Sequence, residues 1–476
     1  CYDGAMKIDY DPQEFYKAHL ARDLRFDGKF FVAVKTTKIY CRPICPARKA
    51  QLKNIEFFIH ATLAEMAGYR PCLRCKPEAA PGSTAWRGTS ALVQRAIRLM
   101  DSTITDENPI AVIAQTLAIS ERWLRELFQT QVGISPQAIL ISKRLDLAKN
   151  LLDHSSLSIT EIAFSAGFQS IRRFNDAFKN RFQENPRAFR KSAKQENIQQ
   201  LQLSYRLPFS WENLLIFFRE RALLGMELVE EHTYQRLVTY GEVRGWFKAS
   251  LAKNNKVHIH FKFNKTVPIL DFVARIKNLF DLDADLMAIE KDLKEDGKLT
   301  PFLAQFKGIR IPGCWDGFEL AVRAIVGQKI SVKAARTVLN RMVAQYGEQQ
   351  NLDDTLPLSR FFPLPQTICA ADLSILGLTT SKIDSIKALA RAVASKEIVL
   401  DGTADEAQTR QQLLAIKGIG PWTVEYIAMR ALKNPDAFPE TDLELQKKIK
   451  RFDLNPKKWL PWRAYAAILL FSLSLE

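Results

Sequence analysis

Four cysteines near the start of the chain constrain its fold more than any other feature. They form two close pairs, Cys41-x3-Cys45 and Cys72-x2-Cys75, with 26 residues between the pairs. Two such pairs joined by a loop of this length have the ligand spacing of a structural zinc site with four thiolate ligands. The alternatives are disulfide bonds, which a reducing compartment disfavours, and four unrelated buried thiols. The spacing favours one Zn²⁺ ion held by all four cysteines.

Basic residues crowd these cysteines in the sequence. They are Arg42, Arg48, Lys49, Arg70, Arg74 and Lys76. A thiolate that binds zinc is deprotonated at neutral pH, and cationic neighbours stabilise its charge further. One of the cysteines could therefore act as a nucleophile as well as a ligand.

The charge of the chain indicates a polyanionic partner. Lys and Arg total 68 against 52 Asp and Glu, which gives a formal net charge of +16 over 476 residues. Residues 1–195 hold 30 basic and 19 acidic residues, a surplus of 11, and the remaining residues have a surplus of 5. A basic front part favours nucleic acid as the partner, although a generic soluble surface can carry such a charge too.

Composition and local hydropathy exclude two classes of protein. Because 47% of the residues are hydrophobic, the chain can bury real cores and is not a disordered polymer. The longest mostly apolar run, residues 464–475, has 12 residues, whereas a membrane span needs about 20. Residues 6–10 are charged and lack the apolar centre of a signal peptide. We therefore expect a soluble cytoplasmic protein.

The length implies three or four domains at roughly 100–200 residues each. Short β-like stretches accompany the cysteines, a helical region follows, residues 256–263 alternate as a strand does, and the rest is helical again. The turn-rich segment 77–88 is typical of a linker. We expect a multidomain α+β protein: a small α/β zinc domain, an all-α domain, a second small α/β domain and an all-α domain. Their predicted bounds are 6–80, 89–195, 201–296 and 297–476.

Two helix-turn-helix patterns follow one another in the second block. In the first, residues 110–128, Ser120 is expected to cap a second helix after the turn. In the second, residues 158–178, Gly167 occupies the turn. One such pattern is weak evidence, because helix pairs without a DNA role are common, but two in tandem predict DNA binding. The side chains expected to read base edges are Arg122, Arg125, Gln169, Arg172 and Arg173.

A second DNA-binding pattern lies near the C-terminus. Gly418-Ile419-Gly420 between two apolar helical stretches is typical of a helix-hairpin-helix turn, in which the backbone approaches a phosphate closely. Lys417 precedes the turn, where we expect it to meet phosphate. Asp442 follows 24 residues after Gly418. Taken by itself, Asp442 is expected to be the N-cap of a helix that begins at Leu443.

The front part of the chain resembles the Ada family of bacterial alkylation-response proteins. The resemblance rests on residues 30–45, Phe-Phe-Val-Ala-Val-Lys-Thr-Thr-Lys-Ile-Tyr-Cys-Arg-Pro-Ile-Cys, and on residues 68–75, Gly-Tyr-Arg-Pro-Cys-Leu-Arg-Cys. The helix pair, followed by residues 185–190, resembles an AraC-type DNA-binding domain, which Ada proteins carry at this place. Complete Ada proteins also contain a Pro-Cys-His-Arg core, and this chain has no such run. Removal of methyl from guanine O6 is therefore not expected.

The Ada resemblance implies a chemical role for the zinc site. By resemblance Cys41 irreversibly accepts a methyl group from a methylphosphotriester in DNA, and the zinc site is completed by Cys45, Cys72 and Cys75. The reaction is a direct displacement at the methyl carbon, which releases a stable phosphodiester anion. A zinc-bound thiolate stays ionised at pH 7 and needs no separate base.

Residues 201–476 resemble the AlkA type of 3-methyladenine glycosylase II, in the helix-hairpin-helix glycosylase superfamily. The hairpin and Asp442 carry the resemblance together with residues 321–331, Ala-Val-Arg-Ala-Ile-Val-Gly-Gln-Lys-Ile-Ser, and 461–466, Pro-Trp-Arg-Ala-Tyr-Ala. It implies release of flipped cationic purines, 3-methyladenine and 7-methylguanine, with Asp442 stabilising the sugar cation. An aromatic slot suits such a cation, and the implied slot residues are Trp422, Tyr426 and Phe471.

Two details of this resemblance concern specificity. AlkA-type enzymes often have Trp where this chain has Phe471, which weakens or reshapes base binding. Bifunctional members of the superfamily place a lysine where Trp422 stands, so no Schiff base and no strand cleavage are expected. The wedge that fills the vacated base stack is expected among Gln328, Lys329 and Ile330.

The combined interpretation is a DNA repair and response protein that joins an Ada-type sensor to an AlkA-type glycosylase. Its partner is double-stranded DNA, both alkylated and promoter DNA; a contact with RNA polymerase is left open, and a monomer is expected. The alternative is a transcription regulator whose glycosylase-like half only binds DNA. Asp442, the hairpin and the aromatic residues argue against that alternative.

Overall fold

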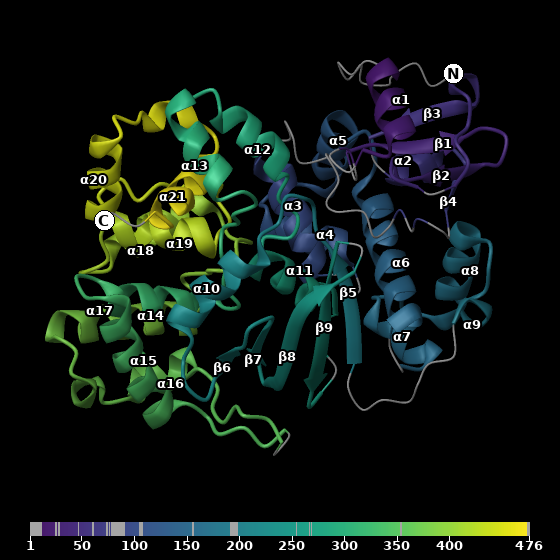
Figure 1. Cartoon of the computed structure of the whole chain (residues 1–476). Helices are drawn as coiled ribbons and strands as arrows, with labels where there is room; N and C mark the ends of the chain where they lie inside the picture. The colour runs from purple at the N-terminus through teal and green to yellow at the C-terminus, as the bar shows by residue number, and fades with distance from the viewer. Residues whose placement is uncertain are drawn as a thin grey trace. The chain divides into compact units, whose positions relative to one another are not determined.

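The computed structural model (Figure 1) describes most of the chain. The described residues are 12–23, 26, 29–45, 47–59, 61–72, 75, 77, 91–103, 108–154, 157–190, 199–253, 255–265, 267, 269–352 and 355–473. The charged segment 6–10 and nearly all of the predicted linker 77–88 lie outside them. Contacts divide the chain into two compact units: Cys1–Arg206 with Asn254–Lys256 and Val267–Ala274, and Leu207–Lys253 with Val257–Thr266 and Arg275–Glu476. The predicted four domains stay a prediction.

The cysteine-containing segment folds around a four-stranded sheet of order β3-β1-β2-β4. Its elements are α1 (Pro12–Ala21), β1 (Phe31–Val34), β2 (Ile39–Cys41), a 3-10 turn (Leu52–Asn54), β3 (Ile55–Phe58), α2 (Ala61–Met66) and β4 (Arg70–Pro71). Strand β1 pairs antiparallel with β2 and β3, and β2 pairs parallel with β4. Alternate residues of β1 enter two different buried clusters, Val32 with Phe15 of α1 and Phe31 with Ala64 of α2. The sheet is therefore covered on both faces.

The predicted tandem helix-turn-helix pairs are present. The helices are α3 (Ala91–Ser102), α4 (Pro109–Thr116), α5 (Glu121–Gln131), α6 (Pro136–His154), α7 (Ile159–Ser165), α8 (Ile171–Phe182) and α9 (Pro186–Phe189). The predicted cap is confirmed, because the Ser120 hydroxyl accepts the N–H of Trp123 at 3.1 Å. Gly167 has φ of +84°, which suits the turn before α8. Buried Phe174, Phe178 and Phe182 leave the remaining faces of α8 for polar residues.

The second unit begins with a sheet and its helices. Strands β9 (Lys256–Phe263), β8 (Val243–Ala252), β7 (Thr233–Tyr240) and β6 (Glu227–Val229) are neighbours in that order, and all of β7 pairs antiparallel with residues 243–250 of β8. The strand predicted at residues 256–263 is thus confirmed as β9. The other elements here are α10 (Trp211–Arg221) and α12 (Leu286–Leu293). Helix α11 (Ile269–Leu279) is divided between the units after Ala274, and β5 (Gln199–Ser204) belongs to the first unit.

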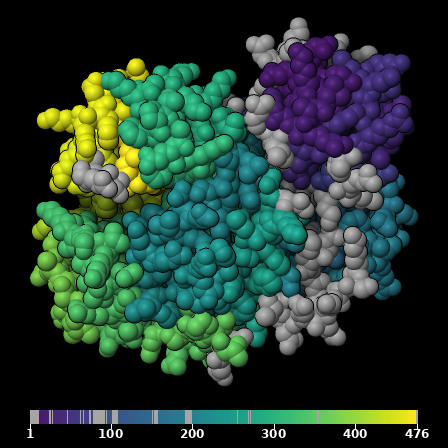
Figure 2. Space-filling model, viewed as in Figure 1, coloured from purple at the N-terminus to yellow at the C-terminus, as the bar shows by residue number. Residues whose placement is uncertain are grey.

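The rest of the second unit is helical. Its helices are α13 (Thr300–Gln305), α14 (Gly317–Gly327), α15 (Val332–Tyr346), α16 (Pro365–Ala370), α17 (Thr380–Ala394), α18 (Glu406–Ala415), α19 (Pro421–Arg430), α20 (Leu443–Arg451) and α21 (Arg463–Phe471), with 3-10 turns at Gly297–Leu299, Leu373–Leu376 and Pro456–Trp459. None of the helices described is long and apolar enough to cross a membrane. Figure 2 shows the surface of this helical part in green to yellow.

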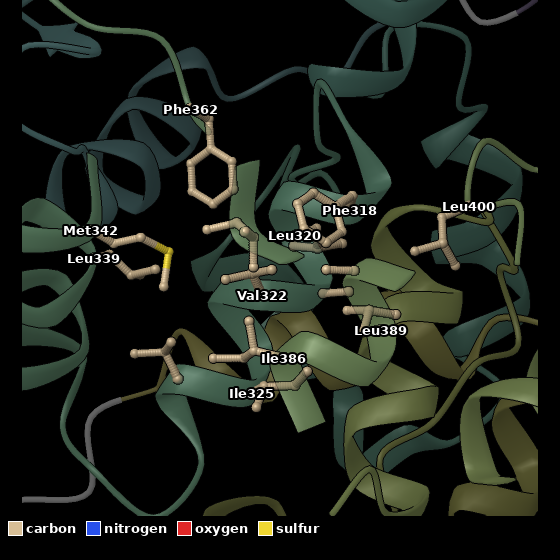
Figure 3. Close-up of a cluster of buried hydrophobic side chains, with 14 of the residues drawn as sticks. Phe318, Leu320, Val322, Ile325, Leu339, Met342, Phe362, Ile386, Leu389 and Leu400 are labelled. Atoms are coloured by element: carbon tan, nitrogen blue, oxygen red, sulfur yellow. The ribbon is translucent and has the colours of Figure 1, made fainter. Parts of the chain in front are cut away.

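Helix α19 lies between two buried cores. One core, drawn in Figure 3, gathers side chains of α14, α15 and α17, and Val424 and Ile427 of α19 belong to it. The other gathers α12, α13, α20 and α21, and Ala428 and Met429 of α19 belong to it. Because both sides of α19 are packed, the first turn of this helix is held in a fixed position. That turn follows the predicted hairpin directly.

Buried ion pairs join the sheet to α14. Arg323 Nη2 lies 2.6 Å from Glu227 Oε2 and 2.7 Å from Glu319 Oε1, and Arg236 Nη2 lies 2.7 Å from Glu319 Oε2. Two guanidinium and two carboxylate groups balance, as buried charges must. Burial opposes the charge of Glu227, but Arg323 and Arg236 outweigh it and keep the pKa of Glu227 below its usual value. The sheet therefore holds α14, whose end leads into the predicted wedge residues.

Candidate functional site

The four cysteines converge as the spacing predicts. Strands β2 and β4 run parallel with Tyr40 beside Pro71, so the next residues, Cys41 and Cys72, emerge side by side. All four Sγ atoms lie within 4.8 Å of one another, and those of Cys45 and Cys72 are 4.0 Å apart. Four ligands at a Zn–S distance of about 2.3 Å around a tetrahedral ion stand about 3.8 Å apart. The thiols are buried, and none of the cysteines described forms a disulfide.

The donor set therefore fits one zinc ion, and the surrounding groups fit its charge. Four thiolates and Zn²⁺ sum to a formal charge of −2. The backbone N–H of Arg42 donates to Cys75 Sγ at 3.4 Å, and the side chain of Arg42 donates to the Cys75 carbonyl. Arg48 is exposed, and Lys49 donates to the carbonyl oxygen of His19. Arg74 and Lys76, also predicted near the cysteines, lie outside the described residues.

The predicted base-reading side chains all face solvent. Arg122 and Arg125 stand on α5, where Arg125 Nη2 pairs with Glu121 at 2.6 Å. The other three lie at or just before the start of α8 and are exposed as well: Gln169, Arg172 and Arg173. Trp123, which the sequence analysis did not single out, is 47% exposed on α5. A large apolar ring on this helix is a candidate contact for the methyl group of thymine.

The hairpin before α19 uses its two glycines differently. Gly418 has φ of +92°, and a β-carbon there would lie 2.2 Å from Ser385 Oγ, so the fold itself requires glycine. Gly420 has φ of −96°, and a β-carbon there would meet no atom within 4 Å. Among the described residues, neither glycine N–H donates to a backbone carbonyl. Lys417 is exposed beside them. Free N–H groups and open space suit a phosphate.

Asp442 lies where two helices meet. Its Oδ1 accepts the N–H of Leu445 at 2.9 Å. The predicted N-cap role of Asp442 at the start of α20 is therefore confirmed. Its Oδ2 accepts the indole N–H of Trp422 at 2.8 Å. Trp422 was predicted as a slot residue in the place of a lysine, and no local pattern indicates this bond between residues 20 apart. These two donors hold the carboxylate in place.

Two of the three aromatic residues predicted for the slot stack on each other. The rings of Trp422 and Tyr426 stack with centroids 5.3 Å apart and planes 11° apart. Arg430 lies over the Tyr426 ring and also donates to the Tyr426 hydroxyl. Burial would raise the pKa of Tyr426, but the charges of Arg430 and Arg221 outweigh it and lower that pKa. Phe471 packs against the core of α20 and α21, and no ring contact joins it to this stack.

The three candidate wedge residues differ in their surroundings. Gln328 Nε2 donates to the Gly418 carbonyl at 3.0 Å and to Thr423 Oγ1 at 2.9 Å, so this side chain is tied to the hairpin. Lys329 and Ile330 are exposed, and Lys329 adopts φ of +58°. The ammonium group of Lys382 on α17 donates to the carbonyls of Val326 and Gln328, each at 2.8 Å. The bonds of Gln328 fix the loop to the hairpin, and the bonds of Lys382 fix it to α17.

Four family models match successive stretches of the chain. They are the metal binding domain of Ada at residues 14–78, a helix-turn-helix domain at 113–192, the AlkA N-terminal domain at 200–316 and the HhH-GPD superfamily of base excision DNA repair proteins at 322–463. The "probable bifunctional transcriptional activator/DNA repair enzyme AlkA" of Mycobacterium tuberculosis is 36% identical over 473 residues, which cover 96% of this chain and 95% of that protein. This chain belongs to the same family.

Two similarities concern the second half of this family member. DNA-3-methyladenine glycosylase 2 of Escherichia coli is 31% identical over 279 residues, 56% of this chain and 94% of that protein. The solved structure of a 3-methyladenine DNA-glycosylase from Archaeoglobus fulgidus superposes with a TM-score of 0.50 over 57% of this chain and 99% of that chain. At 20% identity the second similarity shows the fold alone.

Family membership confirms the main predictions from the sequence. The chain combines an Ada-type zinc domain, a helix-turn-helix region and a helix-hairpin-helix glycosylase fold, as predicted. The buried four-cysteine cluster is the zinc site of the Ada-type domain, and DNA is the partner of the family. The roles assigned to single residues stay predictions.

Proposed function

We propose that the second unit releases alkylated purines, 3-methyladenine and 7-methylguanine, from DNA by hydrolysing the N-glycosidic bond. The observation that carries this proposal is the bond from the Trp422 indole to Asp442, which places a fixed carboxylate beside a stack of two aromatic rings. A regulator that merely binds DNA needs no such pairing. The E. coli relative is described as a DNA-3-methyladenine glycosylase, which supports the same reaction here.

The chemistry follows from the charge of the damaged base. N-alkylated purines are cationic and leave as neutral bases, so little acid catalysis is required. The flipped base stacks on the electron-rich Trp422 ring. Positive charge then develops on the sugar, and the ionised Asp442 stabilises it and orients the attacking water. Because Trp422 and the backbone of Leu445 already hold both carboxylate oxygens, little reorganisation is needed during the reaction.

The loop after α14 supplies the group that replaces the flipped base. The bonds of Gln328 to the hairpin support a positioning role for this residue. Lys329 or Ile330 is then the wedge, because both side chains are exposed on the same loop. The hydrogen bonds from Gln328 to the hairpin would keep the wedge at a fixed distance from the phosphate that the hairpin binds.

Gly420→Ala is expected to weaken binding to a duplex with an abasic-site analogue by about tenfold, without loss of stability. A methyl group at residue 420 meets no protein atom, but it would push a phosphate away from a charge-assisted N–H bond worth about 1.5–3 kcal/mol. Gly418→Ala is the contrasting variant, since positive φ and the Ser385 contact predict a loss of about 1–2 kcal/mol in unfolding free energy. Binding titrations and thermal unfolding of both variants check this; unchanged DNA binding by Gly420→Ala contradicts the phosphate role.

We further propose that the glycosylase is monofunctional. Trp422 stands where bifunctional relatives place a lysine, and its N–H holds Asp442. Borohydride is expected to trap no covalent protein–DNA adduct on any substrate that the protein excises, while a bifunctional glycosylase on its own substrate serves as the positive control. A trapped adduct would show that Lys417 or another amine forms a Schiff base.

We infer that the zinc site accepts methyl groups from DNA through Cys41. Zinc bound to the four thiolates keeps them ionised at neutral pH. The Sγ of Cys41 then attacks the methyl carbon of a methylphosphotriester; a C–S bond forms, the C–O bond breaks, and the phosphodiester anion leaves. Because a thioether is not cleaved again, each protein molecule reacts once. Methyl transfer from labelled methylphosphotriester DNA, which Cys41→Ser should abolish, tests this assignment.

The helix-turn-helix pairs supply promoter recognition. We propose that Arg122, Arg125 and Arg172, with Gln169 and Arg173, read base edges of the operator, since all five side chains are exposed on or beside α5 and α8. The relatives named as transcriptional activators support activation in response to methylation, and contact with RNA polymerase is part of that proposal. The protein would act as a monomer in the cytoplasm, where its DNA substrates are.

A further inference from the structure

A buried arginine connects the zinc-binding segment with the second helix-turn-helix. Arg181, near the end of α8, has a side chain that is only 4% exposed. Its Nη2 lies 2.6 Å from Asp146 Oδ1 on α6 and 2.8 Å from Glu65 Oε1 on α2, and its Nη1 donates to the Ser142 carbonyl at 2.8 Å. The guanidinium of this α8 residue thus contacts two further helices, α6 and α2, and all three helices belong to the first unit.

The same oxygen of Glu65 leads back to the zinc centre. Glu65 Oε1 accepts the hydroxyl of Tyr40 at 2.6 Å. Tyr40 is completely buried and directly precedes Cys41 on β2. A path of three contacts, Cys41–Tyr40, Tyr40–Glu65 and Glu65–Arg181, therefore joins the cysteine proposed to take up methyl to α8. We call Tyr40, Glu65 and Arg181 the buried link.

Packing alone does not require such a link. Burying charges is costly, and apolar residues of similar size often stabilise an interface better than a buried ion pair does. Burial opposes the charge of Arg181, but Asp146 and Glu65 outweigh burial and raise its pKa, so the guanidinium stays charged. Both carboxylates lie within ion-pair distance of Arg181 Nη2 only when α2, α6 and α8 take one relative position, and in that sense the link specifies geometry.

We propose that Tyr40, Glu65 and Arg181 are positioning residues that hold the zinc centre in register with α8, so that methylation of Cys41 is transmitted to operator binding. The inference rests on the function proposed for Cys41. The zinc centre and α8 must contact the same duplex. Their binding free energies add fully only if the two parts are already fixed relative to each other, because otherwise binding has to supply the entropy cost of fixing them. Loss of the link would make the two parts bind more independently and reduce the coupling between methylation and affinity.

The test compares two variants of the link with a matched control. Glu65→Gln removes the charge that Arg181 contacts, and Tyr40→Phe removes one oxygen atom. Tyr69→Phe is the control, because the Tyr69 hydroxyl donates to Glu56 Oε2 at 2.7 Å in the same zinc-binding segment but the pair does not contact Arg181. For the full-length protein we would measure zinc content, thermal unfolding, the rate of methyl transfer to Cys41, and affinity before and after methylation for a duplex that methylated wild-type protein selects from a random-sequence pool.

The expected result is a separation of two activities. All three variants should bind zinc and accept methyl within about twofold of the wild-type rate. The gain in affinity on methylation should fall about tenfold in Glu65→Gln and severalfold in Tyr40→Phe, and stay at the wild-type value in Tyr69→Phe. If Glu65→Gln loses zinc or unfolds, Tyr40→Phe carries the test, because its change is smaller.

Two results would overturn the inference. One is a full methylation gain in folded Tyr40→Phe and Glu65→Gln; the other is an equal loss in Tyr69→Phe, which would show that any disturbance of the segment has the same effect. A wild-type protein that accepts methyl but gains no affinity would contradict the proposed response function itself. That failure is distinguishable, because it appears before any variant is compared.

Discussion

Asp442→Asn is expected to slow the release of 3-methyladenine by several hundred-fold or more. Asn can still cap α20 through its side-chain oxygen, but its amide nitrogen then faces the indole N–H of Trp422 and cannot accept it. It cannot supply the negative charge that stabilises the developing sugar cation. By analogy with the loss of one preorganised electrostatic group, the barrier should rise by about 3–4 kcal/mol. Because the Trp422 bond is lost as well, thermal unfolding has to be measured alongside, so that a loss of stability is separated from the loss in catalysis.

Single-turnover excision from a duplex that contains 3-methyladenine measures this effect. Binding to a duplex with an abasic-site analogue should change little, which separates catalysis from affinity. Glu440→Gln is the matched control: it removes one exposed carboxylate two residues away, which none of our proposals uses, and it should excise at close to the wild-type rate. Near-normal excision by Asp442→Asn would show that the carboxylate is only a helix cap.

Features that depend on short-range spacing were predictable from the sequence. The zinc cluster follows from two cysteine pairs, because a tetrahedral ion needs four thiolates and the chain offers them in ligand spacing. Ser120 and Asp442 were predicted as helix caps, and both are. Strand β9 follows from the alternation of residues 256–263. In each case the physical cause acts within a few residues or through a known ligand geometry.

The contacts that tune the sites were not predictable in this way. The bond from Trp422 to Asp442 joins two helices, Gln328 reaches the hairpin 90 residues away, and Arg181 contacts Glu65 across 116 residues. No periodicity or motif encodes such pairs, because they depend on how whole elements pack. The role of Phe471 stays a prediction: the family pattern places this residue in the base slot, and its half-buried ring packs against the core of α20 and α21.

Methylation of Cys41 is expected to tighten operator binding by roughly 30- to 150-fold at low salt. The zinc centre carries a formal charge of −2 with four thiolates and −1 when one of them becomes a thioether. Removal of one unit of repulsion about 5–7 Å from a DNA phosphate is worth roughly 2–3 kcal/mol at an effective dielectric constant near 20. No change of fold is needed. Because mobile ions screen this repulsion, the gain should shrink as salt rises.

Variants of Cys41 test whether its methylation causes the gain in operator affinity. Cys41→Ser should lose methyl transfer and with it any increase in affinity on exposure to methylphosphotriester DNA, although its hydroxyl is a poor zinc ligand. Zinc content must therefore be measured alongside. Cys41→Ala also removes a ligand and cannot be methylated, so it is the weaker test of the two.

The central claim is that one chain repairs DNA methyl lesions and reports them through its own DNA affinity. The most direct measurement is a titration of operator duplex, selected from a random pool by methylated protein, with the full-length protein before and after treatment with methylphosphotriester DNA, at two salt concentrations. The account predicts a large gain on methylation that decreases at the higher salt. Equal affinity before and after methylation, with transfer to Cys41 verified, would contradict it.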